Sequence, residues 1–276
     1  MTLHIYGRTD GTWLTLSDSW TTSRASGGKR VVKNPDTTKY LTFPTDHTSW
    51  KPGDFAAIAM TYGRAEFRKP NCDTNDTAIS VLQSGLTVTP APAITSLSEL
   101  VDHMWMPVFE RWYDCDQCAV ERDKANDPAN IDSSDAQFPN DLDEYVSNNC
   151  GHTELSVVAV AINSADGHQC CIREWGEEPR YIVQPDRNFQ SSGDGAASCL
   201  IAPESNLIEH LDEVLSRLDR HFDRLAQEAE DYDRSSGISG NGPIGGTRYA
   251  WTLSPTKGFR ELPARAIRPT SDSDTV

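Results

Sequence analysis

The residues of this chain with the clearest chemical potential are two cysteines in the stretch W-Y-D-C-D-Q-C, residues 112–118. Such a pair can be a redox couple, half of a metal site, or two buried thiols. A redox couple needs one thiol of lowered pKa, which a helix N-terminus or a nearby positive charge provides. Here the pair follows a helical pattern, and Asp114 and Asp116 add negative charge. Both effects raise the pKa of the thiols, so metal binding is favoured over redox chemistry.

A second cluster supplies the two further ligands that a metal site would need. Cys150 and His152 follow a polar, acidic stretch at 123–149, and with Cys115 and Cys118 they make a Cys₃His set. Four such ligands are typical of a closed, structural zinc site. The ion would join both ends of the acidic stretch, which has little to bury and needs an anchor. The sequence therefore predicts structural zinc here, with other metal groupings and unliganded thiols left as alternatives.

His168, Cys170 and Cys171 could compete as ligands. They fall on the second strand of an expected hairpin, in which Cys170 pairs with about residue 161. Cys150 then lies on the order of 30 Å down the ladder. Adjacent strand residues face opposite sides, so one cysteine is expected in the core and the other at the surface or in a second layer. Whether any of the three joins the metal site stays open.

Signatures of common enzyme classes are missing from the sequence. It contains no serine-hydrolase elbow, zinc-protease or deaminase motif, kinase set or dinucleotide fingerprint. Thiol–imidazole pairs can be drawn, such as His168 with Cys170 or Cys199 with His210, but they need spatial evidence. Four other histidines are interpreted as surface or satisfied core residues: His4, His47, His103 and His221. No catalytic residue is predicted, so a non-enzymatic role is favoured and enzyme activity is left open.

Charge and composition bound the class of protein. The 276 residues carry a net charge of −16, with aspartate above glutamate and arginine above lysine. Such a surface is similar to that of proteins adapted to high salt, where self-repulsion is screened. The same charge opposes non-specific binding to nucleic acid, so nucleic acid is not an expected partner. An acidic surface can still mimic nucleic acid toward a basic groove.

No signal peptide, transmembrane segment or membrane partner is expected. The N-terminus M-T-L-H-I-Y-G-R has no apolar leader, and the longest apolar run, near 157–162, is too short for a span. Seven cysteines without a leader fit metal binding or burial in a reducing compartment better than disulfides. We expect a cytoplasmic or virion protein.

The first part of the chain, 1–92, predicts a β-rich region. Alternating apolar runs on both sides of Asp10-Gly11 are typical of a hairpin. Further strands are expected at 30–33, 39–43, 54–62 and 79–89. Turn residues such as Pro and Gly separate most of these segments.

A helix and the acidic loop are expected at 93–149. Ser96 and Glu99 form a capping box, and apolar residues recur at helical spacing as far as Trp112. Pro107 lies inside this pattern and should kink or end the helix. The apolar stripe is interpreted as core packing.

A hairpin at 150–178, with its turn at Asp166-Gly167, and a helix at 204–232 are expected next. The helix carries a heptad seam of about three repeats. Its members are Leu207, Leu211, Val214, Leu218, His221 and Leu225. The seam could dimerise, but packing against the sheet of its own domain is favoured.

The end of the chain predicts a Gly-rich linker at 235–246 and a basic C-terminal arm at 247–276. Five basic residues between 247 and 270 stand against one acid. A hinged basic arm is typical of an interaction segment that lies on its own acidic body or on a neighbour's.

Together these patterns predict an α+β fold, with a mainly antiparallel β core, two longer helices and a zinc-clipped loop in one domain at 1–234. The favoured function is a structural or assembly protein that contacts other protein subunits, with self-association through helix 204–232 or arm 247–270. A virion or other assembly component of a high-salt system fits this pattern. The alternatives are a zinc-dependent hydrolase and a nucleic-acid-binding or nucleic-acid-mimicking protein.

Overall fold

The computed structural model is a mixed α+β protein built on two antiparallel sheets, as the sequence predicts. It describes residues 2–24, 29–63, 66–68, 75–88, 93–114, 155–163, 167–186, 188–193, 200–201, 211–240 and 242–267. Among these residues, no helix is long and apolar enough to span a membrane.

The larger sheet has six strands in the order β13-β12-β1-β2-β15-β16. Their bounds are β1 His4–Thr9, β2 Thr12–Ser17, β12 Phe189–Ser192, β13 Leu200–Ile201, β15 Thr247–Ser254 and β16 Gly258–Ala266. The β1–β2 hairpin turns at Asp10 and Gly11, both with positive φ, which confirms the predicted turn.

The second sheet has five strands in the order β11-β10-β9-β6-β5. Their bounds are β5 Tyr40–Phe43, β6 Ala56–Gly63, β9 Leu155–Asn163, β10 Gly167–Glu174 and β11 Arg180–Ile182. The predicted hairpin is confirmed, with Cys170 opposite Val160. Smaller sheets join β3 Thr21–Arg24, β4 Lys29–Asn34 and β14 Ser239–Gly240, and β7 Glu66–Arg68 with β8 Asn75–Thr77.

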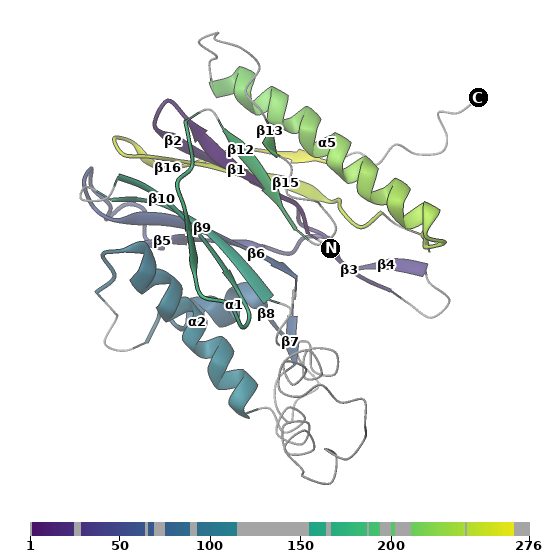
Figure 1. The fold of residues 1–276 in the computed structure, drawn as a ribbon, viewed down its shortest axis with the longest axis horizontal. Coiled ribbons are helices and arrows are strands. Elements are labelled where there is room, and N and C mark those ends of the chain that lie inside the picture. Colours follow the sequence, from purple (N-terminus) through teal and green to yellow (C-terminus); the bar gives the residue numbers. More distant parts are fainter. Residues whose placement is uncertain are drawn as a thin grey trace, which may run out of the picture.

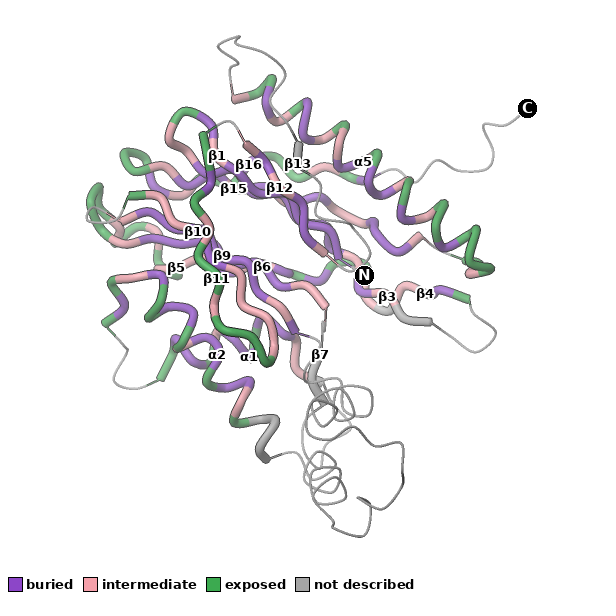
Figure 2. The backbone as a smooth tube through the Cα atoms, viewed as in Figure 1, coloured by how far each residue is buried: buried purple, intermediate pink, exposed green. Residues whose placement is uncertain are grey.

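The two main sheets lie face to face, and helices cover their outer sides (Figure 1). Helix α5 Leu211–Ser235 packs on the six-stranded sheet, and α1 Ala78–Ser84 and α2 Leu97–Asp114 pack on the five-stranded sheet. The central strands of both sheets are therefore buried on both faces, whereas edge strands such as β16 carry exposed residues (Figure 2). This explains why β9 reads as a nearly continuous apolar run, L-S-V-V-A-V-A-I-N.

The layer between the sheets is apolar but is crossed by a few polar bonds. Tyr6 and Trp13 contribute from the six-stranded sheet, and Ile58 and Val160 from the other. The Trp13 indole N–H donates to the Ala161 carbonyl at 2.9 Å across this layer. Such bonds fix the position of one sheet relative to the other, which apolar contacts alone do less specifically.

The strand expected at 79–89 is wrong, because this segment begins with helix α1. Thr77 caps the helix by accepting the Ser80 N–H at 3.1 Å. Four apolar residues at helical spacing are buried against the sheet: Ala78, Ile79, Val81 and Leu82. The run I-S-V-L resembles strand alternation over so few residues, and the cap is the signal that distinguishes the two.

Helix α2 begins as predicted and continues past Pro107. Ser96 and Glu99 form the expected capping box, with the Glu99 N–H donating to Ser96 Oγ and the Ser96 N–H to Glu99 Oε2. Proline removes the bond to the carbonyl four residues earlier, that of His103. A Cβ at Gly85 would lie 2.0 Å from this oxygen, so the end of α1 packs directly onto the freed carbonyl. Of the two outcomes expected for Pro107, a kink or the end of the helix, the second is therefore wrong.

The expected linker contains a short strand of the three-stranded sheet, and the expected basic arm is instead part of the six-stranded sheet over most of its described length. Strand β14 pairs with β4, Ile244 is buried, and β15 and β16 complete the six-stranded sheet. Two of the five basic residues of this segment pair with α5: Arg248 Nε lies 2.8 Å from Asp219 Oδ1, and Arg265 pairs with Asp223. They neutralise the chain's own acidic helix, which charge counting could not distinguish from a free arm.

Helix α5 uses its apolar seam against the sheet, as favoured from the sequence. Val214, Leu218 and Leu225 are buried with Ile5 and Leu16 of the six-stranded sheet. The helix runs to Ser235, three residues past the expected end, and residues 204–210 lie outside the described part of the chain. The packing confirms burial of the seam within the domain.

Candidate functional site

Three side chains from distant parts of the sequence meet at one end of the two-sheet layer. Thr2 closely precedes β1, Asp18 directly follows β2, and Lys39 directly precedes β5. The first two belong to the six-stranded sheet and the third to the five-stranded sheet. The fold, and no local motif, pairs Asp18 with Lys39 and places Thr2 and Lys39 on one cavity.

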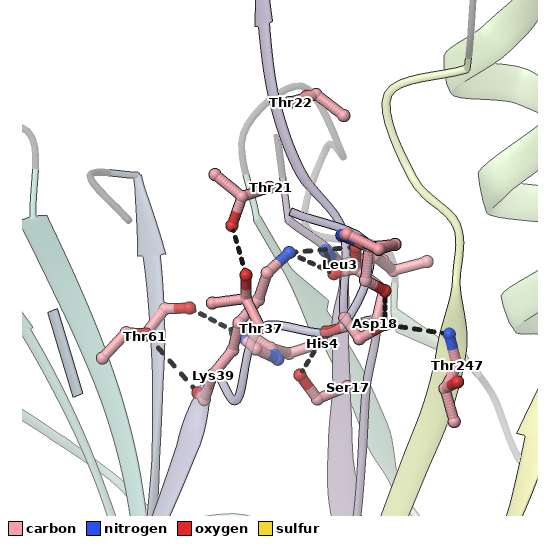
Figure 3. A network of polar contacts seen from close by, with 12 residues as sticks. Leu3, His4, Ser17, Asp18, Thr21, Thr22, Thr37, Lys39, Thr61 and Thr247 are labelled. Carbon is pink, nitrogen blue, oxygen red and sulfur yellow. Dashed lines mark hydrogen bonds and ion pairs between the residues drawn. The ribbon is translucent and has the colours of Figure 1, made fainter. Parts of the chain in front are cut away.

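Asp18 and Lys39 form a buried ion pair (Figure 3). Lys39 Nζ lies 3.0 Å from both Asp18 oxygens, and the exposed fractions of the Lys39 and Asp18 side chains are 3% and 0%. The Leu3 N–H also donates to Asp18 Oδ1, at 2.9 Å. Burial raises the pKa of the Asp18 carboxyl, while the Lys39 ammonium and the Leu3 N–H act against this rise. A fully buried carboxylate requires such partners to stay charged.

Thr2 is held rigidly beside this pair. It is 3% exposed, and the next residue, Leu3, exchanges backbone and side-chain hydrogen bonds with Asp18. On the other side, Gly193 at the end of β12 packs onto Thr2, because a Cβ there would lie 1.7 Å from the Thr2 carbonyl oxygen. Only glycine permits this approach, and the Gly193 φ of +145° also favours glycine.

A small cavity of about 10 Å³ connects Thr2 with Lys39. Its other lining residues are Thr37, Thr38, Thr61, Tyr62, Gly63, Ala78 and Ile79. An ammonium group has three N–H donors, and Asp18 accepts two of them, so one remains for a group in this cavity. The cavity has room for about one water-sized atom. A hydroxyl and a cationic donor thus share a small, largely enclosed space.

The backbone around the pair is fixed by further hydroxyl contacts (Figure 3). Ser17 Oγ donates to the Asp18 carbonyl at 3.1 Å. Thr21 and Thr37 are joined through their hydroxyls at 2.8 Å, and the Thr37 N–H donates to the Ser19 carbonyl. These contacts reduce the freedom of both segments that carry the ion pair, which is the support that a reactive site requires.

The predicted zinc ligands Cys115, Cys118, Cys150 and His152 lie outside the described residues. Within the described ranges, no group of three or more His, Cys, Asp or Glu side chains could hold a metal ion. The zinc site therefore stays a prediction.

The competing ligands on β10 are accounted for by the fold. His168 Nε2 lies 2.6 Å from the Gly11 carbonyl oxygen. Cys170 and Cys171 are free, buried thiols on opposite faces of the sheet, one in the inter-sheet layer and one under α2. Burial raises the pKa of the Cys170 thiol to about 12 and that of Cys171 to about 11. Cys170 therefore lies in the core between the sheets, as expected for one of the two, and Cys171 lies in a second layer, under α2, and not at the surface.

Sequence reasoning missed Thr2, Asp18 and Lys39. Thr2 and Asp18 are 16 positions apart in the sequence, and Asp18 and Lys39 are 21 apart, so no short motif joins them. No one of the three residues stands out from its neighbours in the sequence. One available signal is Asp18 directly after the buried strand T-W-L-T-L-S, where an acid without a partner would be costly. A second is Lys39 among only a few lysines, directly before another strand.

Comparison with known proteins gives no family for this chain. No protein-family model matches it, and no curated protein matches it by sequence. Solved structures with a similar chain trace include Anbu from Hyphomicrobium sp. strain MC1. The TM-score is 0.49 and the sequence identity 10%, and the match covers 98% of this chain and 89% of that one. Anbu (ancestral beta-subunit) from Yersinia bercovieri gives TM-score 0.44 and 12% identity over 98% and 88%. The helical assembly of the Anbu complex from Pseudomonas aeruginosa gives 0.46 and 13% over 99% and 88%.

Proposed function

We propose that the chain is a hydrolase of amide bonds that uses Thr2 as an N-terminal nucleophile once the peptide bond before Thr2 has been cleaved. A threonine hydroxyl is a weak nucleophile and needs an adjacent base. The freed α-amino group of Thr2 would be such a base, within reach of its own hydroxyl. The Lys39 ammonium beside it would favour the alkoxide character that develops during attack.

The proposed reaction follows the usual two steps of acyl transfer. Thr2 Oγ attacks the substrate carbonyl carbon while the α-amino group accepts the hydroxyl proton. The C–N bond then breaks, the proton passes to the leaving amine, and an ester remains on Thr2 Oγ. Water attacks this ester and gives a proton to the same amino group. The bond between the acyl carbon and Thr2 Oγ then breaks, the proton returns to Thr2 Oγ, and the acid is released.

The observation that carries the proposal is the buried ion pair of Lys39 and Asp18 next to Thr2. A buried ion pair is weak evidence for a stabilising role, since desolvation of two charges offsets most of their attraction. A pair whose lysine lines the same small cavity as a threonine can have a chemical use instead. Asp18 is the counter-ion of Lys39, and Lys39 lines the same cavity as Thr2.

The experiment is hydrolysis of a panel of fluorogenic peptide amides by wild type and four variants. Thr2→Ala should reduce the rate to background, and Thr2→Ser should retain part of it. Lys39→Ala should lose about 10²–10⁴-fold in kcat. Thr15→Ser alters a buried threonine of the same sheet and should leave the rate unchanged. Equal rates in wild type and Thr2→Ala would overturn the proposal.

We propose zinc at Cys115, Cys118, Cys150 and His152 as a separate, structural feature, supported by ligand type and spacing. Zinc content should be one ion per chain in wild type and should be lost in Cys115→Ser. Cys170→Ser, at a buried free thiol, is the control and should keep the metal. Metal-free wild-type protein, purified without chelator, would end the proposal.

We propose self-association as a second role, in line with the expected contacts to other subunits. The supporting observation is Tyr232, which is 62% exposed on the outer side of α5 although it is large and apolar. Sedimentation at several protein concentrations should show association in wild type and less in Tyr232→Lys. A concentration-independent monomer in wild type would contradict this role.

A further inference from the structure

His4 makes a polar bond between the two sheets directly beside the candidate site. It is the first residue of β1, is 0% exposed, and its Nε2 lies 2.6 Å from the carbonyl oxygen of Thr61 on β6. Because a carbonyl only accepts hydrogen bonds, Nε2 carries the proton. Burial lowers the pKa of His4 to about 3, and the charge of Lys39 acts in the same direction, so the imidazole is neutral. Among the described residues, His4 Nδ1 has no partner.

Thr61 is hydrogen-bonded to Lys39 as well as to His4. The Thr61 N–H donates to the Lys39 carbonyl at 2.9 Å, and Thr61 Oγ1 donates to the same oxygen at 3.4 Å. The backbone of Lys39 is therefore held by the residue that His4 holds. Thr61 and Lys39 also line the cavity with Thr2.

The contacts close into a circuit that crosses the inter-sheet layer twice (Figure 3). From His4 it runs to Thr61, from Thr61 to the Lys39 backbone, and from Lys39 Nζ to the Asp18 carboxylate. Asp18 Oδ1 accepts the N–H of Leu3, the residue before His4 in the chain. Each residue of this circuit is linked to two others, by hydrogen bonds or by the chain itself. Lys39 therefore cannot shift without breaking one of these hydrogen bonds.

We propose that His4 is a positioning residue for the Thr2 reaction. Through Thr61 it fixes the start of β5, and so holds the Lys39 ammonium on Asp18 beside the cavity that Thr2 lines. This inference rests on the proposed function for its effect on rate, but its effect on the position of Lys39 is independent of any activity.

The chain contains a matched control for this role. His168 on β10 makes the same type of bond between the sheets, from Nε2 to the Gly11 carbonyl, also at 2.6 Å. Gly11 lies in the β1–β2 turn, at the opposite end of β1 from His4. Removal of either imidazole deletes one cross-sheet hydrogen bond, but only His4 is joined to Lys39.

The experiment compares kcat and KM for a fluorogenic peptide amide in three variants. His4→Phe should lower kcat at least about tenfold at unchanged KM, because a displaced ammonium stabilises the transition state less. His4→Gln, whose amide N–H can donate to Thr61, should recover most of the loss. His168→Phe should leave both constants unchanged. Equal effects of His4→Phe and His168→Phe on kcat, or none, would overturn the proposal.

A crystal structure of the His4→Phe variant decides the role of His4 even if no substrate is hydrolysed. We expect Lys39 Nζ to leave its position at 3.0 Å from both Asp18 oxygens. An unchanged pair would overturn the positioning role. Wild-type protein without hydrolysis, combined with a displaced Lys39 in the variant, would end the proposed function and leave the positioning role intact.

Discussion

Lys39 Nζ donates to both carboxylate oxygens of Asp18 at 3.0 Å, and this ion pair joins the two sheets at the end where Thr2 lies. Neither side chain has meaningful contact with solvent. The pair lies among hydroxyl groups and backbone atoms that fix both of its members. A charge pair in this setting holds both sheets at this end of the sandwich, where Lys39 and Thr2 line one cavity.

Removal of one partner should destabilise the protein strongly. Lys39→Met leaves the buried Asp18 carboxylate without its counter-ion, and we expect the free energy of unfolding to fall by about 3–5 kcal/mol. The double variant Lys39→Met/Asp18→Asn should recover most of this loss, because a neutral amide can still accept the Leu3 N–H. Urea unfolding measures both. A double variant as unstable as the single one would contradict the ion pair as described.

His4 should make stability depend on pH. Its pKa in the folded chain is about 3, against a usual value near 6.5, so the unfolded chain takes up this proton first as the pH falls. The stability contributed by neutral His4 is therefore present above pH ~6.5 and is lost progressively toward pH ~3. Between pH 7 and pH 5, wild type should lose about 2 kcal/mol more than His4→Gln.

Urea midpoints of wild type and His4→Gln at pH 7 and pH 5 measure this difference. The other groups that titrate in this range are common to both proteins, so their contributions cancel in the comparison. Parallel losses in the two proteins would show that His4 takes up its proton in the folded state as readily as in the unfolded one.

Gly193→Ala should damage both stability and the site. The new Cβ would meet the Thr2 carbonyl, so either β12 or Thr2 must move. Gly53→Ala is the control, since Gly53 also has positive φ but a Cβ added there would have no atom within 4 Å. Both substitutions carry backbone strain, and Gly193→Ala should cost about 1–3 kcal/mol more from overpacking. Thermal unfolding and peptide hydrolysis check the two effects; equal Tm values would contradict the close approach.

The overall class of the fold could be predicted because its signals are local. Alternation on both sides of Asp10-Gly11, the capping box at Ser96 and the seam of α5 each lie within a few turns or one hairpin. The order of the strands could not be predicted. Strands β12 and β15 flank the β1–β2 hairpin although they come from the second half of the chain.

The misread segments have a common physical cause. The run after Thr77 is too short to separate a helix from a strand by period. From the sequence, Arg248 and Arg265 are interpreted as unpaired charges of a free arm. Their partners, Asp219 and Asp223, lie on α5, which is separated from the two arginines by the Gly-rich segment. Pairing at such separation is decided by tertiary structure.

The candidate site could not be found from the sequence for the same reason. Thr2, Asp18 and Lys39 become neighbours only when β1, β2 and β5 are placed in two facing sheets. The cysteine cluster was visible because cysteine is a rare residue and its members form two short local spacings, Cys-x-x-Cys and Cys-x-His. It lies outside the described residues. The virion and high-salt expectations also stay expectations.

The measurement that tests the central claim most directly is peptide mapping by mass spectrometry after treatment with a β-lactone, an electrophile that acylates activated hydroxyl groups. We predict that the N-terminal peptide of wild type and of Thr15→Ser begins at Thr2 and carries one acyl group on that residue. The N-terminal peptides of Thr2→Ala and Lys39→Ala should carry no acyl group. A wild-type peptide that begins at Thr2 without an acyl group, a Thr2 still joined to a preceding residue, or an acyl group on a different residue would contradict the claim that Thr2 is the nucleophile.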